Sequence, residues 1–301
     1  MSKSLKKIKI ACRGIWGLFM SLLSFFLKKN VLKPNCSGPK VIVSVSSFGK
    51  RAEKTLPVTL RSLLLQKRLP DKIVVWLDEE SFSESNLPKS LSSMRKYGVE
   101  IRYCHDLKSY TKLVPSLMEF PDDVIITVDD DQYYCNNMIL ALLKGYEKHP
   151  DHVICSLGHV PCFDSDGMLL PYNSWTANVR TGYHEILFPL GVGGVLYPPR
   201  SLYSDVTDSN IFLSLSPYAD DIWFWTMELK KGTKSYLADL KRMPGYPIDL
   251  IDQLVHKGQS LMDINVRNNR NDVQIHDVFN HYGISPDKDG VMELLNNNVL
   301  V

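Results

Sequence analysis

The chain has 301 residues, of which 44% are hydrophobic and 23% are charged, as in a globular protein with a sizeable core. Its formal charge of +2 combines a basic N-terminus with an acidic body: residues 1–33 hold eight Lys or Arg and no acid, which leaves about −6 for the rest. Nucleic-acid binders usually have a basic body, so this composition excludes a nucleic-acid partner.

The N-terminal residues 1–33 predict a basic amphipathic helix. Within residues 14–27, small or polar residues recur at helical spacing, and large apolar side chains cover the rest of the surface. The apolar run is shorter than the roughly 20 residues that cross a bilayer. It ends in Lys28 and Lys29 instead of a signal-peptide cleavage site. The small or polar stripe consists of Arg13, Gly17, Ser21, Ser24 and Lys28.

We therefore expect a helix that lies on a membrane surface, with its cations facing anionic lipid. The expected location is the cytoplasmic face of the (inner) membrane, as a peripheral or monotopic protein. Two alternatives remain open, a signal-anchor that spans the membrane and a helix packed on the protein itself. Residues 34–40, rich in Pro and Gly, are predicted to be a linker.

From residue 41 the hydrophobic pattern alternates between strand-like and helix-like segments. Strands are predicted at residues 41–47, 72–80, 99–104, 123–131 and 152–157. Helices are predicted at residues 53–68, 87–98, 109–120, 137–150 and 218–232. This alternation predicts an α/β fold, with a Rossmann-like, mostly parallel sheet flanked by helices. Between residues 160 and 200 the sequence is rich in Pro, Gly and aromatic residues, which is typical of functional loops.

Polar residues follow three of the predicted strands, where ligands bind in such sheets. They are Ser44, Ser46 and Ser47; Asp78, Glu79 and Glu80; and Asp129, Asp130 and Asp131. The three consecutive aspartates suit either a solvated turn or a divalent cation held with substrate phosphates. Asp220 and Asp221 pose a similar choice. Acids at this position can stabilise a helix N-terminus through the helix dipole. Alternatively, one of the two carboxylates is a general base whose pKa is raised by Trp223 and its aromatic neighbours.

The six cysteines form no CxxC pair and no zinc-finger spacing, so we expect free thiols in a reducing compartment.

The order of the segments VIVSVSSFGKR, LRSLLLQ, PDKIVVWLDEE, DVIITVDDD, GVGGVLYPP and ADDIWFW resembles bacterial glycosyltransferases of the GT-A fold. The resemblance is to family-2-like enzymes of surface polysaccharide or lipopolysaccharide synthesis, and it covers about residues 40–240. It implies a DxD motif at Asp129-x-Asp131, with Mn²⁺ or Mg²⁺ bound at Asp131 and Asp129. It also implies that Asp221 is the catalytic base and that Asp220 supports it.

The resemblance further implies a donor site and an acceptor site. Donor-binding candidates are Ser46, Ser47, Arg51, Asp78, Lys112, Asp129 and Asp130. Candidates for contact with the acceptor or the donor sugar are Trp175, Gly193, Gly194 and Trp223. The two tryptophans suit sugar stacking or a core position, and the two glycines suit close backbone approach or a plain turn. His276 is a minor candidate for the metal shell.

The predicted division of the chain is a helix at 1–33, a linker at 34–40, a catalytic domain at 41–240 and a C-terminal extension at 241–301. Within the catalytic domain, residues 41–135 form the nucleotide-sugar half and residues 136–240 the acceptor half.

The leading hypothesis is a metal-dependent inverting glycosyltransferase that uses a nucleotide-sugar donor, with UDP as the favoured nucleotide. The acceptor would be a glycan or glycolipid at the membrane. A nucleotidyltransferase acting on sugar phosphates, a non-catalytic membrane-bound sugar-nucleotide-binding protein and a retaining mechanism are the alternatives.

Overall fold

The computed structural model describes the backbone of residues 3–32, 40–180, 182, 184–240, 242–248 and 269–296, with side chains from residue 12 onward. The predicted linker therefore lies outside the described residues except for Lys40, and so does the Asn-rich run up to residue 268.

The predicted strands join one seven-stranded sheet. Its members are β1 (Val41–Ser47), β2 (Lys72–Asp78), β3 (Val99–Cys104), β4 (Val124–Thr127), β6 (Val153–Cys155), β10 (Val195–Tyr197) and β11 (Ser235–Leu237). They lie in the order β11-β6-β10-β4-β1-β2-β3. All neighbouring pairs are parallel except those of β10, which is antiparallel to both β4 and β6. The predicted mostly parallel sheet is confirmed.

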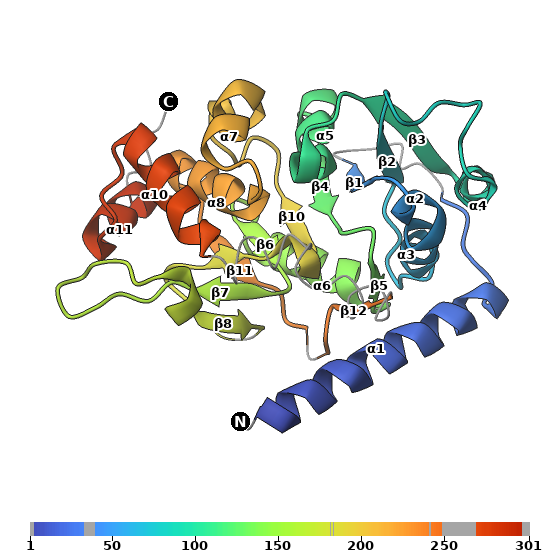
Figure 1. The fold of residues 1–301 in the computed structure, drawn as a ribbon, viewed down its shortest axis with the longest axis horizontal. Coiled ribbons are helices and arrows are strands. Elements are labelled where there is room, and N and C mark those ends of the chain that lie inside the picture. Colours follow the sequence, from blue (N-terminus) through green and yellow to red (C-terminus); the bar gives the residue numbers. More distant parts are fainter. Residues whose placement is uncertain are drawn as a thin grey trace.

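Helices cover both faces of this sheet (Figure 1). They are α2 (Arg51–Lys54), α3 (Leu56–Leu63), α4 (Lys89–Ser92), α5 (Val114–Glu119), α6 (Met138–Lys148), α7 (Ser209–Leu215), α8 (Asp220–Lys231), α10 (Arg270–Tyr282) and α11 (Lys288–Asn296). The α3 and α6 side chains pack with Val43 and Val45 on one face. On the other, α5, α8 and α10 pack with Ile125 and Val195. The predicted α/β class is therefore confirmed.

The antiparallel strand β10 was missed by the sequence analysis, which expected a loop there. Its three residues, Val195 to Tyr197, are all buried between β4 and β6. A run of three apolar residues is too short to carry the alternating pattern of a strand. This strand brings the preceding glycine turn, Gly191–Gly193, to the edge of the sheet where β1 and β4 end.

Two smaller sheets accompany the large one. Strands β7 (Gly158–Val160), β8 (Thr176–Val179) and β9 (Phe188–Pro189) form one of them. In the other, β5 (Gln132–Tyr134) pairs antiparallel with β12 (Gly245–Pro247). The amide of Ile248 also donates to the Asp131 carbonyl over 3.0 Å. The segment after residue 240 is thus joined to the aspartate loop.

The N-terminal helix α1 (Lys3–Phe26) lies along one side of the molecule, beside β5 and β12 (Figure 1). Its buried positions include Gly17, Ser21 and Ser24, so part of the small or polar stripe faces the body. The predicted alternative of a helix packed on the protein itself therefore describes how α1 lies. Within the described part of the chain, no helix combines the length and apolarity needed to cross a bilayer.

The five cysteines that the structure describes are free thiols: Cys12, Cys104, Cys135, Cys155 and Cys162. The predicted division into 1–33, 34–40, 41–240 and 241–301 stays a prediction. Beyond residue 240, α10 packs against α8 through Phe279 and Trp225, whose ring centroids lie 5.9 Å apart.

A buried carboxyl group in α8 gives a stability prediction. Glu228 is 1% exposed, and Ser235 Oγ donates to its Oε2 over 2.5 Å. Burial raises its pKa to about 8. The ordinary pKa of a glutamate side chain is 4.5. As pH rises above that value, Glu228 ionises in the unfolded chain before it ionises in the folded chain, so the contribution of Glu228 to stability falls until about pH 8.

We expect Glu228→Gln to remove this penalty. The variant should gain melting temperature relative to the wild type as pH rises, most clearly above about pH 8, as measured by calorimetry. Glu147→Gln, on the exposed face of α6, is the matched control. An equal difference between Glu228→Gln and wild type at about pH 5 and about pH 9 would contradict the assignment.

Candidate functional site

The ends of β1 and β4 meet at the three aspartates. Ser47, the last residue of β1, donates its hydroxyl to the Asp130 carboxylate. Arg51, which begins α2, places Nη2 2.5 Å from Asp130 Oδ1 and 2.9 Å from Asp131 Oδ2. The predicted donor-binding residues Ser47, Arg51 and Asp130 therefore lie together, beside the predicted metal ligand Asp131.

Hydrogen bonds from two other elements fix the backbone of the aspartate loop. Thr59 Oγ1 in α3 lies 2.8 Å from the Asp130 carbonyl and 2.9 Å from the Gln132 carbonyl. Tyr134 in β5 accepts from the Asp129 amide over 2.9 Å and lies 3.2 Å from the Val192 carbonyl. Since the loop is held from both sides, its carboxylates are preorganised.

The three aspartates differ in exposure. The Asp130 side chain is 6% exposed, whereas those of Asp129 and Asp131 are 28% and 25% exposed. Burial raises the pKa of Asp130 to about 6, against the opposing effect of Arg51. Burial also raises the pKa of Asp131, again opposed by Arg51. Asp130 therefore supports the loop, and its two neighbours are the carboxylates that a ligand can reach.

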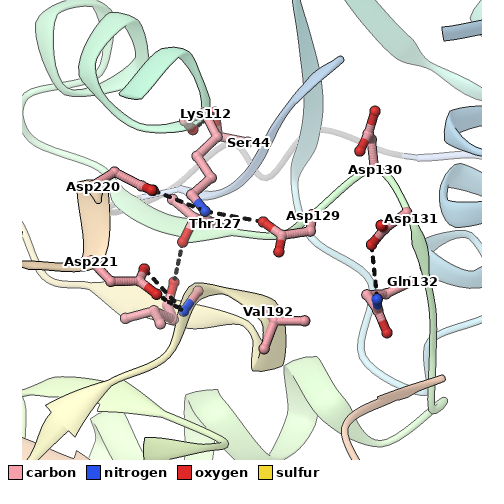
Figure 2. A network of polar contacts seen from close by, with 12 residues as sticks. Ser44, Lys112, Thr127, Asp129, Asp130, Asp131, Gln132, Val192, Asp220 and Asp221 are labelled. Carbon is pink, nitrogen blue, oxygen red and sulfur yellow. Dashed lines mark hydrogen bonds and ion pairs between the residues drawn. The ribbon is translucent and has the colours of Figure 1, made fainter. Parts of the chain in front are cut away.

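Lys112 joins the aspartate loop to a second acidic pair. This residue ends a short 3₁₀ helix, η2 (Lys108–Lys112). Its Nζ lies 3.0 Å from Asp129 Oδ1 and 3.0 Å from Asp220 Oδ2. Dashed lines in Figure 2 mark both contacts. Lys112 is buried, and the surrounding carboxylates raise its pKa well above its ordinary value despite its burial. The sequence predicted a donor contact at Lys112, and the structure shows that Lys112 links two acidic residues 91 positions apart.

Asp221 lies beside the glycine turn before β10. The Gly191 amide donates to both its carboxylate oxygens, over 3.2 and 3.3 Å (Figure 2). Burial and the nearby Asp220 raise its pKa to about 7. A Cβ at residue 191 would lie 2.8 Å from both Asp221 Oδ1 and Lys112 Nζ, so a larger residue would have to displace the ends of these two side chains. Asp221 is thus a carboxyl group poised to exchange a proton near neutral pH.

This region has more negative than positive charges, so a divalent cation can bind there without an excess of positive charge. Among the residues that the structure describes, the five carboxylates of Asp129 to Asp131 and of Asp220 and Asp221 lie with two cations, Arg51 and Lys112. Within the described residues, no three His, Cys, Asp or Glu side chains form a complete metal shell. Mg²⁺ and Mn²⁺ commonly take one or two carboxylates and complete their shell with water and substrate phosphates. Asp129 and Asp131 fit that pattern.

Ser46 and Asp78 are the two remaining residues that were predicted to bind the donor. Ser46, paired in the sheet with Trp76 of β2, is partly buried. Asp78 accepts from the Ser81 hydroxyl over 2.6 Å, and this hydrogen bond lowers its pKa. Asp78 also caps its own turn by accepting from the backbone amides of Glu80 and Ser81. Donor binding by Ser46 and Asp78 stays a prediction.

The predicted sugar-stacking role of Trp175 and Trp223 is wrong for this structure, because both rings are buried. Trp175 is 4% exposed, and its Nε1 donates to the Leu170 carbonyl over 2.8 Å. Trp223 is fully buried, and its Nε1 donates to the Val206 carbonyl over 3.2 Å. Ring faces packed in the core are not available to a sugar.

The predicted glycines serve close packing in this structure. A Cβ at Gly193 would lie 2.7 Å from Leu157 Cβ, and Gly194 has a φ of +90° that favours glycine. Contact of Gly193 and Gly194 with a sugar stays a prediction. His276 is exposed on α10 and lies 3.2 Å from its neighbour Asp277, which gives no support to a place in the metal shell.

Two residues that hold the site were missed by the sequence analysis. Thr59 and Tyr134 bind the aspartate loop through its backbone, as described above. The only signal for Tyr134 was its place three residues after the aspartates, and Thr59 gave none, because its role depends on the packing of α3.

No protein-family model matches the sequence, and no curated protein matches it. Solved structures give distant likenesses. The mannosyltransferase PcManGT from Pyrobaculum calidifontis, in complex with GDP-Man and Mn²⁺, is 11% identical, with a TM-score of 0.43 over 96% of this chain and 77% of its own. The CMP:2-keto-3-deoxy-manno-octonic acid synthetase complexed with CTP is 12% identical, with a TM-score of 0.41 over 73% and 97%.

A third likeness is to glucosyl-3-phosphoglycerate synthase from Mycobacterium tuberculosis, in complex with Mn²⁺, UDP and glucosyl-3-phosphoglycerate. It is 13% identical, with a TM-score of 0.31 over 42% of this chain and 51% of its own. At these scores the likenesses assign no activity to this chain, so a functional proposal depends on the geometry of its own site.

The link through Lys112 predicts a large loss of stability when it is removed. Lys112→Met leaves Asp129 and Asp220 without their cation, and breaking a buried pair costs about 3–5 kcal/mol. Denaturant unfolding near neutral pH measures the change, with Lys144→Met on the exposed surface of α6 as the control. The double variant Lys112→Met/Asp220→Asn should recover part of the loss. A Lys112→Met variant as stable as Lys144→Met would contradict the role of this pair.

Proposed function

We propose that this chain is a metal-dependent inverting glycosyltransferase that uses a nucleotide-sugar donor. The observation that carries the proposal is the pair of 3.0 Å contacts that Lys112 makes to Asp129 and Asp220. These contacts unite two acidic centres at the ligand-binding edge of an α/β sheet. One centre suits a metal and a diphosphate, and the other suits a base.

The aspartate loop would hold the leaving diphosphate. Asp129 and Asp131 would be the metal ligands, and Asp130 would keep the loop in place through Ser47 and Arg51. The bound cation would offset the negative charge that grows on the diphosphate as the sugar leaves. Arg51, 35% exposed beside Asp131, can turn its guanidinium to a phosphate oxygen.

Asp221 would be the general base. An acceptor hydroxyl must lose a proton as it attacks the sugar, and a carboxylate whose pKa is about 7 can take that proton near neutral pH. Asp220 is less suited to this role, since its carboxylate is already paired with Lys112. Attack from the face opposite the diphosphate would invert the anomeric carbon.

The acceptor proposed here is a glycan or glycolipid of surface polysaccharide synthesis, at the cytoplasmic face of the membrane. Support comes from the basic residues 1–33 and from the exposed apolar side chains of α1. The nucleotide of the donor is proposed to be UDP.

Donor binding tests the metal assignment. Thermal shift with UDP-, GDP- and CMP-linked sugars should give stabilisation that requires Mn²⁺ or Mg²⁺, because mass action favours the folded state that binds the ligand. Asp131→Asn should lose the metal-dependent part of the shift, whereas Asp122→Asn, on the exposed surface, should keep it. Stabilisation of Asp131→Asn equal to that of wild type, with the same dependence on metal, would disprove the assignment.

Catalysis tests the base. Hydrolysis of the donor that binds, a transfer to water, should rise with pH through about 7 and level off above it, because only ionised Asp221 accepts a proton. Asp220, Lys112 and Asp129 are the charged neighbours that set this pKa, and removing the Lys112 cation should move the profile to higher pH.

Asp221→Asn should lower kcat by about 10²–10⁴-fold, with donor binding nearly unchanged. Loss of donor binding in Asp221→Asn would instead place this residue in the nucleotide site. An unchanged pH profile in that variant would show that another group is the base.

A further inference from the structure

Helix α1 is oriented opposite to the usual amphipathic helix of a globular protein. Such a helix normally turns its large apolar side chains to the core. Here the buried positions are Gly14, Gly17, Ser21 and Ser24. The large apolar side chains are exposed instead: Ile15, Trp16, Leu18, Phe19, Leu22, Leu23, Phe25 and Phe26. We call this set the outward face of α1.

The exposure of the outward face is large. Phe19 is 52% exposed, Leu22 is 57% exposed and Phe26 is 88% exposed. Contiguous apolar surface of this kind marks a binding surface in a soluble protein.

The packing of α1 keeps this face turned outward. At Gly17 a Cβ would lie 2.2 Å from the Pro247 carbonyl oxygen, so the helix backbone lies directly against β12. Buried Arg61 of α3 donates to Ser24 Oγ over 3.2 Å, and its guanidinium carbon lies 3.8 Å from the centre of the Phe25 ring. The following segment is anchored as well, since Leu32 donates its amide to the Tyr97 carbonyl over 3.0 Å.

The charge of the segment selects the partner. Every charged residue among residues 1–33 is a Lys or Arg, with Arg13 and Lys28 bordering the apolar stretch. A second copy of this helix would bring like charges together at either end. A bilayer with anionic lipid offers both an apolar layer for the rings and opposite charge for the cations.

We propose that the outward face of α1 is a docking surface for an anionic lipid bilayer, in which the helix lies in the interface plane while it stays packed on β12 and α3. Membrane binding would then fix the orientation of the whole body, because β12 is paired with β5 and the next residue, Ile248, donates its amide to the Asp131 carbonyl. Membrane docking depends on α1 and not on the proposed reaction. Experiments that disprove docking would therefore rule out the proposed location without bearing on the proposed chemistry.

The tryptophans provide a direct probe of this face. Trp16 is 49% exposed, whereas Trp76, Trp175, Trp223 and Trp225 are all buried. Vesicles of phosphatidylcholine and phosphatidylglycerol in a three-to-one mixture, with brominated acyl chains, should therefore quench mainly Trp16. Trp16→Phe should lose this quenching and still pellet with the vesicles.

Two charge-matched double variants separate the outward face from a general effect of added acid. Phe19→Glu/Leu22→Glu should bind the anionic vesicles at least roughly tenfold more weakly in co-sedimentation, since binding scales with buried apolar area. Met118→Glu/Val273→Glu removes two exposed apolar side chains elsewhere, 69% and 55% exposed, and should bind like the wild type. Lys28→Gln/Lys29→Gln should weaken binding to anionic vesicles more than to vesicles of phosphatidylcholine alone.

Three results would overturn the proposal. One is the absence of binding to anionic vesicles, and another is binding without quenching of Trp16. The third is a lipid-free dimer in analytical ultracentrifugation that Phe19→Glu/Leu22→Glu dissociates, because the outward face would then be an interface between two copies.

Discussion

The candidate site depends on one buried cation. Lys112 Nζ lies between Asp129 and Asp220, and it holds together two acidic groups that are 91 positions apart in the sequence. A buried ammonium requires compensating carboxylates, and buried carboxylates require a cation. The ion pairs therefore fix where η2, the aspartate loop and the start of α8 meet. Asp131 pairs with Arg51, and Asp221 accepts hydrogen bonds from the Gly191 amide.

The glycine turn before β10 completes this arrangement. Because β10 runs antiparallel between β4 and β6, the turn at Gly191–Gly193 reaches both acidic centres. Its Gly191 amide binds Asp221, and its Val192 carbonyl lies within hydrogen-bond distance of the Tyr134 hydroxyl beneath Asp129. The turn before this single short strand thus contacts both the proposed base and the proposed metal loop.

Much of this arrangement follows from the sequence. The β-branched run ending in Ser47 and the apolar run ending in Asp129 predicted two strands of a mostly parallel sheet, and the structure pairs them in parallel. The helix that begins at Asp220 was predictable from its acids and from Gly232, which ends it in a left-handed conformation. Local sequence patterns are enough to predict a helix or strand when one residue type at one spacing determines that element.

Other features depend on packing between distant segments, and no local pattern reports them. The partners of Lys112 lie 17 and 108 positions away, and no local spacing distinguishes such an ion-pair link from a solvated charge. The aromatic residues around Trp175 and Trp223 suggested a sugar platform, because an aromatic ring in a core and one in a site look alike in sequence. The orientation of α1 is a further case. Its pattern predicted two faces, and the burial of Gly17, Ser21 and Ser24 shows which of them packs on the protein.

The proposed binding of a metal and a diphosphate by Asp129 and Asp131, beside Lys112, can be tested crystallographically. An anomalous difference map from crystals grown with Mn²⁺ and a nucleoside diphosphate would locate the metal. We expect a manganese peak in contact with both carboxylates, with phosphate oxygens completing the shell and no metal contact at Asp221. A bound diphosphate with manganese elsewhere, or with no manganese near Asp129 and Asp131, would contradict it.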